Sequence, residues 1–497
     1  MSDGRLRMGT KLGYGVGSIG EIAIYIAFNT WNFLFYNQVL GLSGTLAGLA
    51  VTISLVIDAI SDPIVGSISD RLRSKLGRRH PFLFAAPIPL AITFFLLYSP
   101  PAGLSGIPLF LWFTLFATLH RQAMTLYSVP HLALGAELST DYHERSVVMS
   151  YGTLFGVFGG AGVFFFGWTW FSKIPGGSTV RDGYPGLALG VGLVSAIAIF
   201  LSAFLTRDQI PRLTKNLPPQ AASQRHGLGE LLGEIKSCMS NRNYRMLLIG
   251  LITLGASTGT RETVTSYASL FFWELPEKQI RVFGLVTPPA YFVAFFATVW
   301  LHRRIDKRNT IVAAVSLLGV CMLTPIALRL LGLAPANGSP ALLPFLLTFV
   351  FGFYLSLAML MISALSALAD IADEHELLTG RRQEGVFYAA RTFFLKMSSG
   401  LGHVVAGVAL DLIQFPTGAK PGEVSADVVF KLGLLDGPIA AIPAFISIAF
   451  YGAYRIDRNK HIEIQRALET RRASLTPSAT TSAAAPSTLI QPEHASS

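Results

Sequence analysis

Two acidic residues stand one helical turn apart within an apolar stretch of the chain. Asp58 and Asp62 are four positions apart, in the segment that runs from Ile57 to Pro63. On a helix this spacing places both carboxylates on one face, where they repel each other unless a cation or a proton neutralises them. Hard cations prefer oxygen ligands, and the Ser61 hydroxyl could supply another oxygen. The pattern predicts a cation site, with sodium bound by both acids if sodium is the ion. The alternative is a structural pair that is satisfied by a lysine or by helix ends at the cytoplasmic edge.

Other charged and polar side chains also fall within apolar stretches. A charge at the centre of a bilayer costs about 2.5 kcal/mol or more, so such side chains usually face a cavity or a partner. Lys396 is predicted to pair with the two acids, where an incoming cation would compete with it; the alternative is an ammonium group that reaches the aqueous edge. The candidates for binding a solute are Glu21, Tyr25, Arg121, Ser128, Tyr151, Arg261, Glu262 and Trp273. For each of them, packing or a structural ion pair is the alternative.

Apolar helices are needed to position these residues. The chain has 497 residues, of which 51% are hydrophobic and 14% are charged, whereas a soluble domain carries about 25% charged residues. A spanning helix needs about 20 apolar residues, and the apolar runs are too long for the strands of a barrel. We therefore predict an all-α polytopic membrane protein with twelve transmembrane helices. They are placed near residues 14–37, 43–69, 81–99, 107–138, 146–172, 185–206, 244–273, 281–301, 310–333, 342–370, 385–412 and 430–455.

These helices form two groups of six. The predicted domains are an N-terminal half at 1–206, a cytoplasmic central loop at 207–243 and a C-terminal half at 244–456. Residues 457–497 are predicted to be a disordered cytoplasmic tail, because the chain beyond Arg466 is rich in Ser, Thr, Ala and Pro. The repetition of a six-helix unit is typical of secondary transporters.

The distribution of Lys and Arg predicts the orientation. The loop 70–80 carries five such residues and the loop 302–308 carries four, whereas the loops 37–44 and 100–106 carry none. Basic loops lie on the cytoplasmic side, so both termini are predicted to be cytoplasmic, in a multi-pass protein of the plasma (cytoplasmic) membrane. The net charge of +10 then reflects these loops and not nucleic-acid binding. Neither of the two cysteines is predicted to form a disulfide.

Several motifs resemble the glycoside–pentoside–hexuronide:cation symporter family of the major facilitator superfamily, which includes the melibiose permease. The matching segments are Asp58–Arg71, Gly77–Phe82, Val129–Leu138, Asp141–Ser146 and Ala369–Glu374, followed by Lys396. The resemblance covers the chain from about Lys11 to Ile456. It implies the fold of that superfamily. It also implies that Asp58, Asp62 and Thr125 provide the cation ligands, with Lys396 beside them.

The chain departs from the family at positions that bear on the ion and the solute. Ser61 stands where the sodium-using melibiose permease has an asparagine, so both Na⁺ and H⁺ stay open as the coupling ion. The charged sugar-binding positions of that permease fall on Ile22, Ser128 and Thr153, with Glu21 one place away from the first. A galactoside is therefore not implied, and other glycosides, a uronide or a more apolar solute stay open.

These features together predict a cation-coupled (Na⁺ or H⁺) symporter of a small organic solute, a glycoside or related sugar, that works by alternating access. The alternative solute is a lysophospholipid or another amphipathic molecule, because some animal members of the wider family carry lysophospholipids. We expect no enzyme activity, since no nucleophile with a base and no metal set is evident. The expected partners are the solute, the coupling cation and membrane lipid, without a cofactor or nucleic acid, and the protein is expected to be a monomer.

Overall fold

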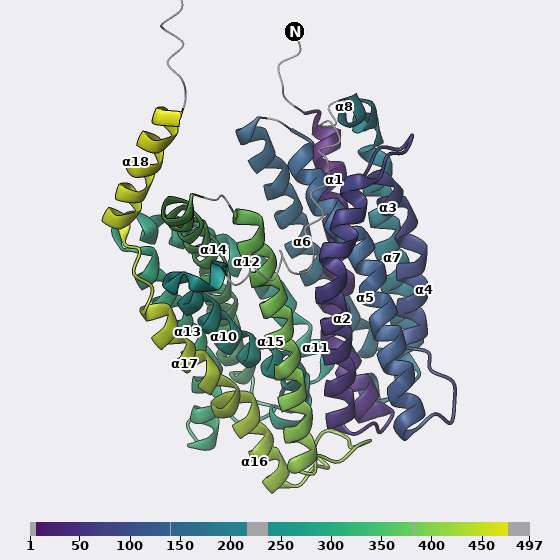
Figure 1. The fold of residues 1–497 in the computed structure, drawn as a ribbon. Coiled ribbons are helices and arrows are strands. Elements are labelled where there is room, and N and C mark those ends of the chain that lie inside the picture. Colours follow the sequence, from purple (N-terminus) through teal and green to yellow (C-terminus); the bar gives the residue numbers. More distant parts are fainter. Residues whose placement is uncertain (1–5, 140, 216–236, 381–382, 476–497) are drawn as a thin grey trace, which may run out of the picture.

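The computed structural model describes residues 6–139, 141–215, 237–380 and 383–475. Helices account for every regular element in these ranges, and they form one bundle (Figure 1). The prediction of an all-α polytopic fold is therefore confirmed. Nine of the described helices are long and apolar enough to cross a membrane.

The N-terminal half contains a helix at each of the six predicted positions. These helices are α1 (Met8–Phe33, continued by the π segment η1, Leu34–Val39), α2 (Gly44–Arg71), α3 (His80–Ala85) with α4 (Pro87–Leu97), α5 (Gly106–Glu137), α6 (Tyr142–Phe171) and α7 (Gly183–Leu205). The predicted single helix at 81–99 is divided into α3 and α4. Pro87 begins the second part, because a proline has no backbone N–H to continue the ladder of the preceding turn.

The C-terminal half also contains a helix at each predicted position. These helices are α10 (Arg242–Tyr267, continued by η4, Ala268–Phe272), α11 (Glu277–Ile280) with α12 (Val282–Arg304), α13 (Lys307–Leu330), α14 (Leu342–Thr379), α15 (Glu384–Leu412) and α16 (Ala426–Leu434), which continues through η5 (Leu435–Ile439) into α17 (Ala440–Gly452). Helix α14 extends to Thr379, well past the predicted end at residue 370.

Three of the predicted spans are not among the nine most apolar helices. They are α1, α5 and α10, which have 26, 32 and 26 residues and are therefore long enough to cross a bilayer. Their polar character comes from charged residues such as Glu21 on α1, Arg121 on α5 and Arg261 on α10. Glu21 and Arg261 line the cavities described below, and Arg121 lies beside Asp58, which explains how these charges are accommodated.

The prediction that residues 457–497 are disordered is wrong for the first part of this segment. Residues Arg458–Leu475 form helix α18, which packs against the C-terminal half through the buried side chains of Ile464 and Leu468. The Gln465 amide also donates a hydrogen bond to Asp373 Oδ2 at 2.6 Å. The Ser- and Ala-rich composition of the tail therefore did not predict this docked helix. Residues 476–497 lie outside the described part of the chain.

The predicted central loop, 207–243, is also partly helical. Helix α8 (Ile210–Lys215) follows a short 3-10 turn directly after α7, and residues 237–240 form a further helical turn before α10. The segment between them, residues 216–236, lies outside the described residues.

The two halves contact each other at the end of the bundle that lies away from the basic loops. We call the end with residues 72–79 and the start of α1 the basic end, and the other the opposite end (Figure 1). At the opposite end, Asp411 of α15 accepts hydrogen bonds from the backbone N–H groups of Gly44 and Thr45 at 2.7 and 2.8 Å. This carboxylate therefore caps the N-terminus of α2, a helix of the other half.

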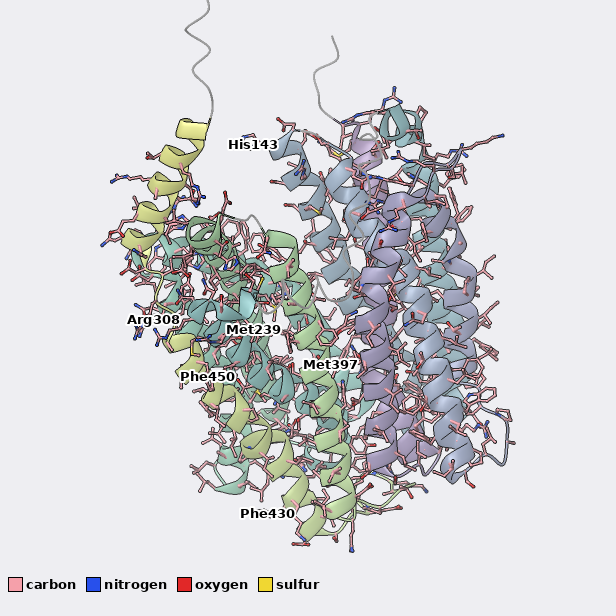
Figure 2. All side chains as sticks on the ribbon, in the orientation of Figure 1. His143, Met239, Arg308, Met397, Phe430 and Phe450 are labelled. Carbon is pink, nitrogen blue, oxygen red and sulfur yellow. The ribbon has the colours of Figure 1, made fainter. Side chains whose placement is uncertain are left out.

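Small residues allow the backbones of the halves to come close together. A Cβ atom at Gly407 of α15 would overlap the carbonyl oxygen of Gly44 on α2. Figure 2 shows Met397 of α15 midway along the bundle, with His143 towards the basic end and Phe430 at the opposite end. Helices α2 and α15 thus run together from the opposite end to the middle of the bundle, where Lys396 lies.

Candidate cation and solute site

Two acids of one half are bridged by a lysine of the other half. The Lys396 ammonium on α15 donates hydrogen bonds to Asp58 Oδ2 at 2.7 Å and to Asp62 Oδ2 at 2.5 Å on α2. Asp58 is buried, whereas the side chains of Asp62 and Lys396 are 22% and 24% exposed. The predicted juxtaposition of these three residues is therefore present in the structure. The partial exposure of two of them gives water a route to the cluster.

Thr125 of α5 contacts the other oxygen of each acid. Its Oγ1 lies 2.7 Å from Asp58 Oδ1 and 3.1 Å from Asp62 Oδ1. A hydroxyl has a single proton, so it can donate to only one carboxylate at a time. The cluster therefore gathers four carboxylate oxygens and one hydroxyl oxygen, the donor set that a hard cation prefers. A cation bound there would use oxygens that Lys396 already contacts.

The structure does not direct the Ser61 hydroxyl towards the two carboxylates. Ser61 Oγ donates a hydrogen bond to the backbone carbonyl oxygen of Asp58 at 3.0 Å. Serine commonly makes this contact to the preceding turn of its own helix. Among the residues predicted to bind the cation, Ser61 is thus the one whose observed contact lies outside the acid cluster.

Arg121 lies beside the acid cluster and not at a solute cavity. Its Nε donates to Ser54 Oγ at 3.0 Å, its Nη1 lies 3.9 Å from Asp58 Oδ2, and its guanidinium carbon lies 4.6 Å from the centre of the Phe28 ring. The predicted solute contact is therefore not supported by the geometry, because the guanidinium is buried against this acid. The cluster contains two acids and two bases, so its formal charges balance.

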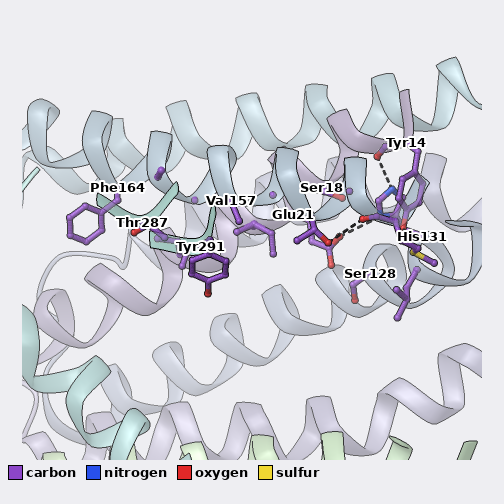
Figure 3. A pocket seen from close by; sticks show the side chains of 18 of the residues that line it. Tyr14, Ser18, Glu21, Ser128, His131, Val157, Phe164, Thr287 and Tyr291 are labelled. Carbon is purple, nitrogen blue, oxygen red and sulfur yellow. Dashed lines mark hydrogen bonds and ion pairs between the residues drawn. The ribbon is translucent and has the colours of Figure 1, made fainter. Parts of the chain in front are cut away.

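A cavity of about 670 Å³ lies between the halves and reaches the acid cluster. We call it the first cavity. The predicted residues Glu21 and Ser128 line it together with Asp62 and Lys396, and Figure 3 shows Glu21, Ser128 and His131 on one side of it. The C-terminal half contributes Lys396 and four further residues: Gly284, Thr287, Tyr291 and Tyr354. Tyr14, near the start of α1, places one end of the first cavity towards the basic end.

A second cavity, of about 340 Å³, lies between the first cavity and the opposite end, and contains the other predicted charges. Four of the solute-binding candidates, Tyr25, Arg261, Glu262 and Trp273, line it. Asp436, in η5 at the end of α16, lines it as well and was not among the predicted residues. The signal that identified Asp58, an acid within an apolar run, applies equally to Asp436.

The adjacent charges of α10 have different partners. Arg261 Nη1 lies 3.8 Å from Asp436 Oδ1, and its guanidinium carbon lies 4.9 Å from the centre of the Phe353 ring. Glu262 Oε2 lies 3.9 Å from His403 Nε2. The two neighbours therefore do not need each other as partners, because their side chains diverge around the helix.

Four residues line both cavities and so mark the boundary between them. They are Ile26, Phe164, Tyr291 and Tyr354, from α1, α6, α12 and α14. Tyr151, which was predicted to bind solute, lines neither cavity, and its hydroxyl contacts Met8 Sδ at 3.5 Å.

His131 of α5 is a lining residue of the first cavity that was not predicted as a site residue. Its Nδ1 lies 3.4 Å from Glu21 Oε2 (Figure 3). Its ring is buried between those of Tyr14 and Tyr127. The sequence places His131 only within a family motif. A histidine inside an apolar helix nevertheless is the same kind of signal as the charged residues already singled out.

Comparisons with known proteins agree with this architecture. The profile of the family described as MFS/sugar transport protein matches residues 13–458. The putative glycoside/cation symporter YagG of Escherichia coli is 24% identical over 90% of this chain and 92% of its own length. The mouse sphingosine-1-phosphate transporter MFSD2B is 25% identical over 90% of this chain and 89% of its own length.

Solved structures show the same fold. A point mutant of the nucleoside transporter NupG superposes with a TM-score of 0.63 at 15% identity, covering 90% of this chain and 100% of that one. The xylose transporter XylE from Escherichia coli gives a TM-score of 0.59 at 14% identity, covering 93% and 98%. These proteins are transporters and not enzymes. The chain therefore belongs to the MFS/sugar transport protein family of the major facilitator superfamily, as a multi-pass integral membrane transporter that resembles the glycoside–pentoside–hexuronide symporters.

Proposed function

We propose that this protein is a cation-coupled secondary active symporter of a small organic solute, and that it works by alternating access. The observation that carries the proposal is the bridge from Lys396 to Asp58 and Asp62, because it joins the two halves through the oxygens that a cation would use. We place it in the plasma (cytoplasmic) membrane with its basic end on the cytoplasmic side. The name of the relative YagG supports symport with a cation.

The coupling follows from competition for the two carboxylates. With Lys396 and Arg121 in place, the two acids are neutralised, and Lys396 joins α2 to α15. A cation that enters the cluster takes over this neutralisation and releases Lys396, which weakens the link between the halves. Solute binding is coupled to this event if each ligand favours the occluded state more in the presence of the other. Sodium suits the all-oxygen donor set, and a proton would neutralise one acid directly.

The solute that we favour is a glycoside or a related sugar. The first cavity lies within the usual range of small-molecule sites, about 300–1,000 Å³. Glu21, Ser128 and Thr153 on one side and Tyr291 and Tyr354 on the other offer hydroxyl or carboxylate groups to a solute with several hydroxyls. These groups come from both halves, so a single bound solute would contact both.

An amphipathic solute is the second candidate. Much of the lining of the first cavity is apolar, including Ile22, Leu132, Val157 and Phe164. A lysophospholipid could place its acyl chain against these residues and its headgroup near Lys396. The similarity to the sphingosine-1-phosphate transporter MFSD2B supports this alternative.

An uptake screen with purified protein in liposomes tests the proposal. Radiolabelled sugars, uronides and lysolipids are offered with an inward sodium gradient, an inward proton gradient or no gradient, and protein-free liposomes provide the control. We expect one sugar or uronide to accumulate above its external concentration with one of the gradients. Accumulation of a lysolipid alone would favour the second candidate, and the absence of gradient-driven accumulation across the screen would contradict cation coupling.

A further inference from the structure

A glutamate and a histidine form a defined pair in the first cavity, separate from the Asp58 and Asp62 cluster. Glu21 of α1 and His131 of α5 approach to 3.4 Å between Oε2 and Nδ1. The Glu21 side chain is 23% exposed to the cavity, whereas that of His131 is 2% exposed. The other ring nitrogen, Nε2, lies 3.2 Å from the backbone carbonyl oxygen of Tyr14 (Figure 3).

The partner of Nε2 determines where the ring protons lie. A carbonyl oxygen can only accept a hydrogen bond, so Nε2 must carry a proton and donate it to Tyr14. In a neutral ring the proton of Nδ1 is then absent, and its lone pair faces Glu21. Two acceptors at this distance repel each other if Glu21 is ionised. The contact is therefore favourable only when one proton lies on Nδ1 or on the Glu21 carboxyl.

The ring of His131 is held in this orientation. It stacks between the rings of Tyr14 and Tyr127, with centroid distances of 4.3 and 4.7 Å and interplanar angles of 18° and 20°. This arrangement holds the plane of the imidazole, because a tilt out of that plane would break both stacking contacts. Both phenol rings are also good partners for a protonated imidazole, because aromatic faces attract cations.

Among the described residues, the charged groups nearby give the pair no other neutralising partner. From α1 and α5 the facing titratable groups are Tyr14 and Tyr127, which are neutral near pH 7. Helices α6 and α7 pack against this part of α1, and the residues with which they approach it are uncharged, such as Gly152 and Ser195. Across the cavity, Asp62 and Lys396 neutralise each other.

We propose that Glu21 and His131 form a proton-binding pair that holds one shared proton at neutral pH and exchanges it with the water of the first cavity. The pair is a second protonatable site, distinct from the acid cluster. Insofar as it concerns transport, the proposal rests on the proposed function: a solute hydroxyl that binds Glu21 would compete with His131, so solute affinity would depend on pH even where the coupling ion is sodium.

A second glutamate–histidine contact in the described part of the chain lacks these features and provides an internal comparison. Glu262 and His403 are 3.9 Å apart, and the Glu262 side chain is 43% exposed. His403 Nδ1 faces the Thr263 hydroxyl at 2.6 Å, a group that can donate or accept, so the ring can present a proton to Glu262 without taking up another. The contact between Glu262 and His403 therefore requires no shared proton. For this reason Glu262→Gln is the matched control for Glu21→Gln.

The test counts protons on the pair directly, in the full-length protein without solute and without sodium. Imidazole-¹⁵N NMR reports the protonation of His131, identified among the ten histidines by the signal lost in His131→Asn. Infrared difference spectra report protonated carboxyl groups, with Glu21 identified by the band lost in Glu21→Gln and retained in Glu262→Gln. We expect one proton on the pair at pH 7: either both His131 nitrogens protonated with Glu21 ionised, or a Glu21 carboxyl band with a neutral ring.

A neutral His131 together with an ionised Glu21 at pH 7 would overturn the proposal. If Glu21→Gln does not fold, the carboxyl band is identified with ¹³C-labelled glutamate in His131→Asn and wild type, and the same two outcomes apply. Because the sample contains neither cation nor solute, a result that overturns the proton-binding pair would not bear on the proposed role of the acid cluster. Conversely, failure of gradient-driven uptake would not remove a proton counted on this pair.

Discussion

The two cavities differ in where the partners of their charges come from. In the first cavity, Asp62 of the N-terminal half is neutralised by Lys396 of the C-terminal half. In the second, Arg261 faces Asp436, and both belong to the C-terminal half. A charge pair within one half stabilises that half in every conformation, whereas a pair between the halves changes when the halves move. Only a pair between the halves can therefore couple ion binding to alternating access.

The largest effect is expected when the pair between the halves is broken from the lysine side. Lys396→Met leaves Asp58 and Asp62 without their shared ammonium. Removing one partner of a buried pair costs about 3–5 kcal/mol, and we expect the lower end of this range because Lys396 is partly exposed. Thermal unfolding in detergent measures the loss. Sodium or a lower pH should recover part of it, because either neutralises the acids.

An exposed lysine of the same half is the control for this change. Lys431 pairs with Asp427 on the surface of α16, so Lys431→Met should change the free energy of unfolding by less than about 1 kcal/mol and without dependence on sodium. Equal losses in both variants would contradict the buried role of Lys396.

A smaller effect is expected from the pair within the C-terminal half. Arg261→Gln and Asp436→Asn should each destabilise the protein by about 2 kcal/mol, because each leaves a buried charge with a weakened partner. The double variant should lose less than the sum of the two, which a double-mutant cycle measures. The ratio of uptake with and without the cation gradient should be retained in the folded variants. If uptake by these variants no longer depended on the cation gradient, the proposed difference between the two cavities would be contradicted.

The cap between α15 and α2 should have a still smaller effect. Asp411→Asn weakens the charged cap on Gly44 and Thr45, and the loss of a cap costs about 1 kcal/mol. Opening at the opposite end should increase by about fivefold. The reaction of Asn29→Cys in the second cavity with an impermeant maleimide measures this opening, in a background without Cys238 and Cys321. Asp427→Asn is the control, and an unchanged rate in Asp411→Asn would refute the cap's role.

The smallest effect is expected at Ser61. Because its hydroxyl bonds to the Asp58 carbonyl oxygen, Ser61→Ala should leave the apparent cation affinity within about threefold of wild type, which is less than about 1 kcal/mol. Thr125→Val removes a hydroxyl that contacts both acids, and should weaken the affinity by more. Cation dependence of uptake measures both, and a larger effect at Ser61 than at Thr125 would show that Ser61 turns towards the ion.

The sequence was sufficient for the helices and for the juxtaposition of Asp58, Asp62 and Lys396. Apolar length predicts spans, and a charge in an apolar run is tolerated only beside a partner or a cavity, so these two signals are strong. The directions of individual side chains could not be predicted. Arg121 lies against Asp58, and Tyr151 lies outside both cavities, because rotation about a helix axis is set by packing against neighbouring helices.

The docking of surface segments could not be predicted from the sequence either. The helix α18 is polar overall, and its order depends on a few contacts such as Ile464 and Gln465 with the C-terminal half. Composition averages over such contacts and therefore favoured disorder. Asp436 and His131 were missed although each is a polar residue within an apolar run, the same signal that identified Asp58 and Lys396; the structure shows their partners to be Arg261 and Glu21.

The central claim is that a cation and Lys396 compete for Asp58 and Asp62. The most direct measurement compares gradient-driven accumulation with gradient-free equilibration of the same solute, in liposomes that contain wild type or Asp58→Asn. Asp58→Asn keeps the shape of the side chain but removes the charge that the cation needs. We predict that the variant still equilibrates solute but no longer concentrates it with the cation gradient. Accumulation by Asp58→Asn to the level of wild type would contradict the account.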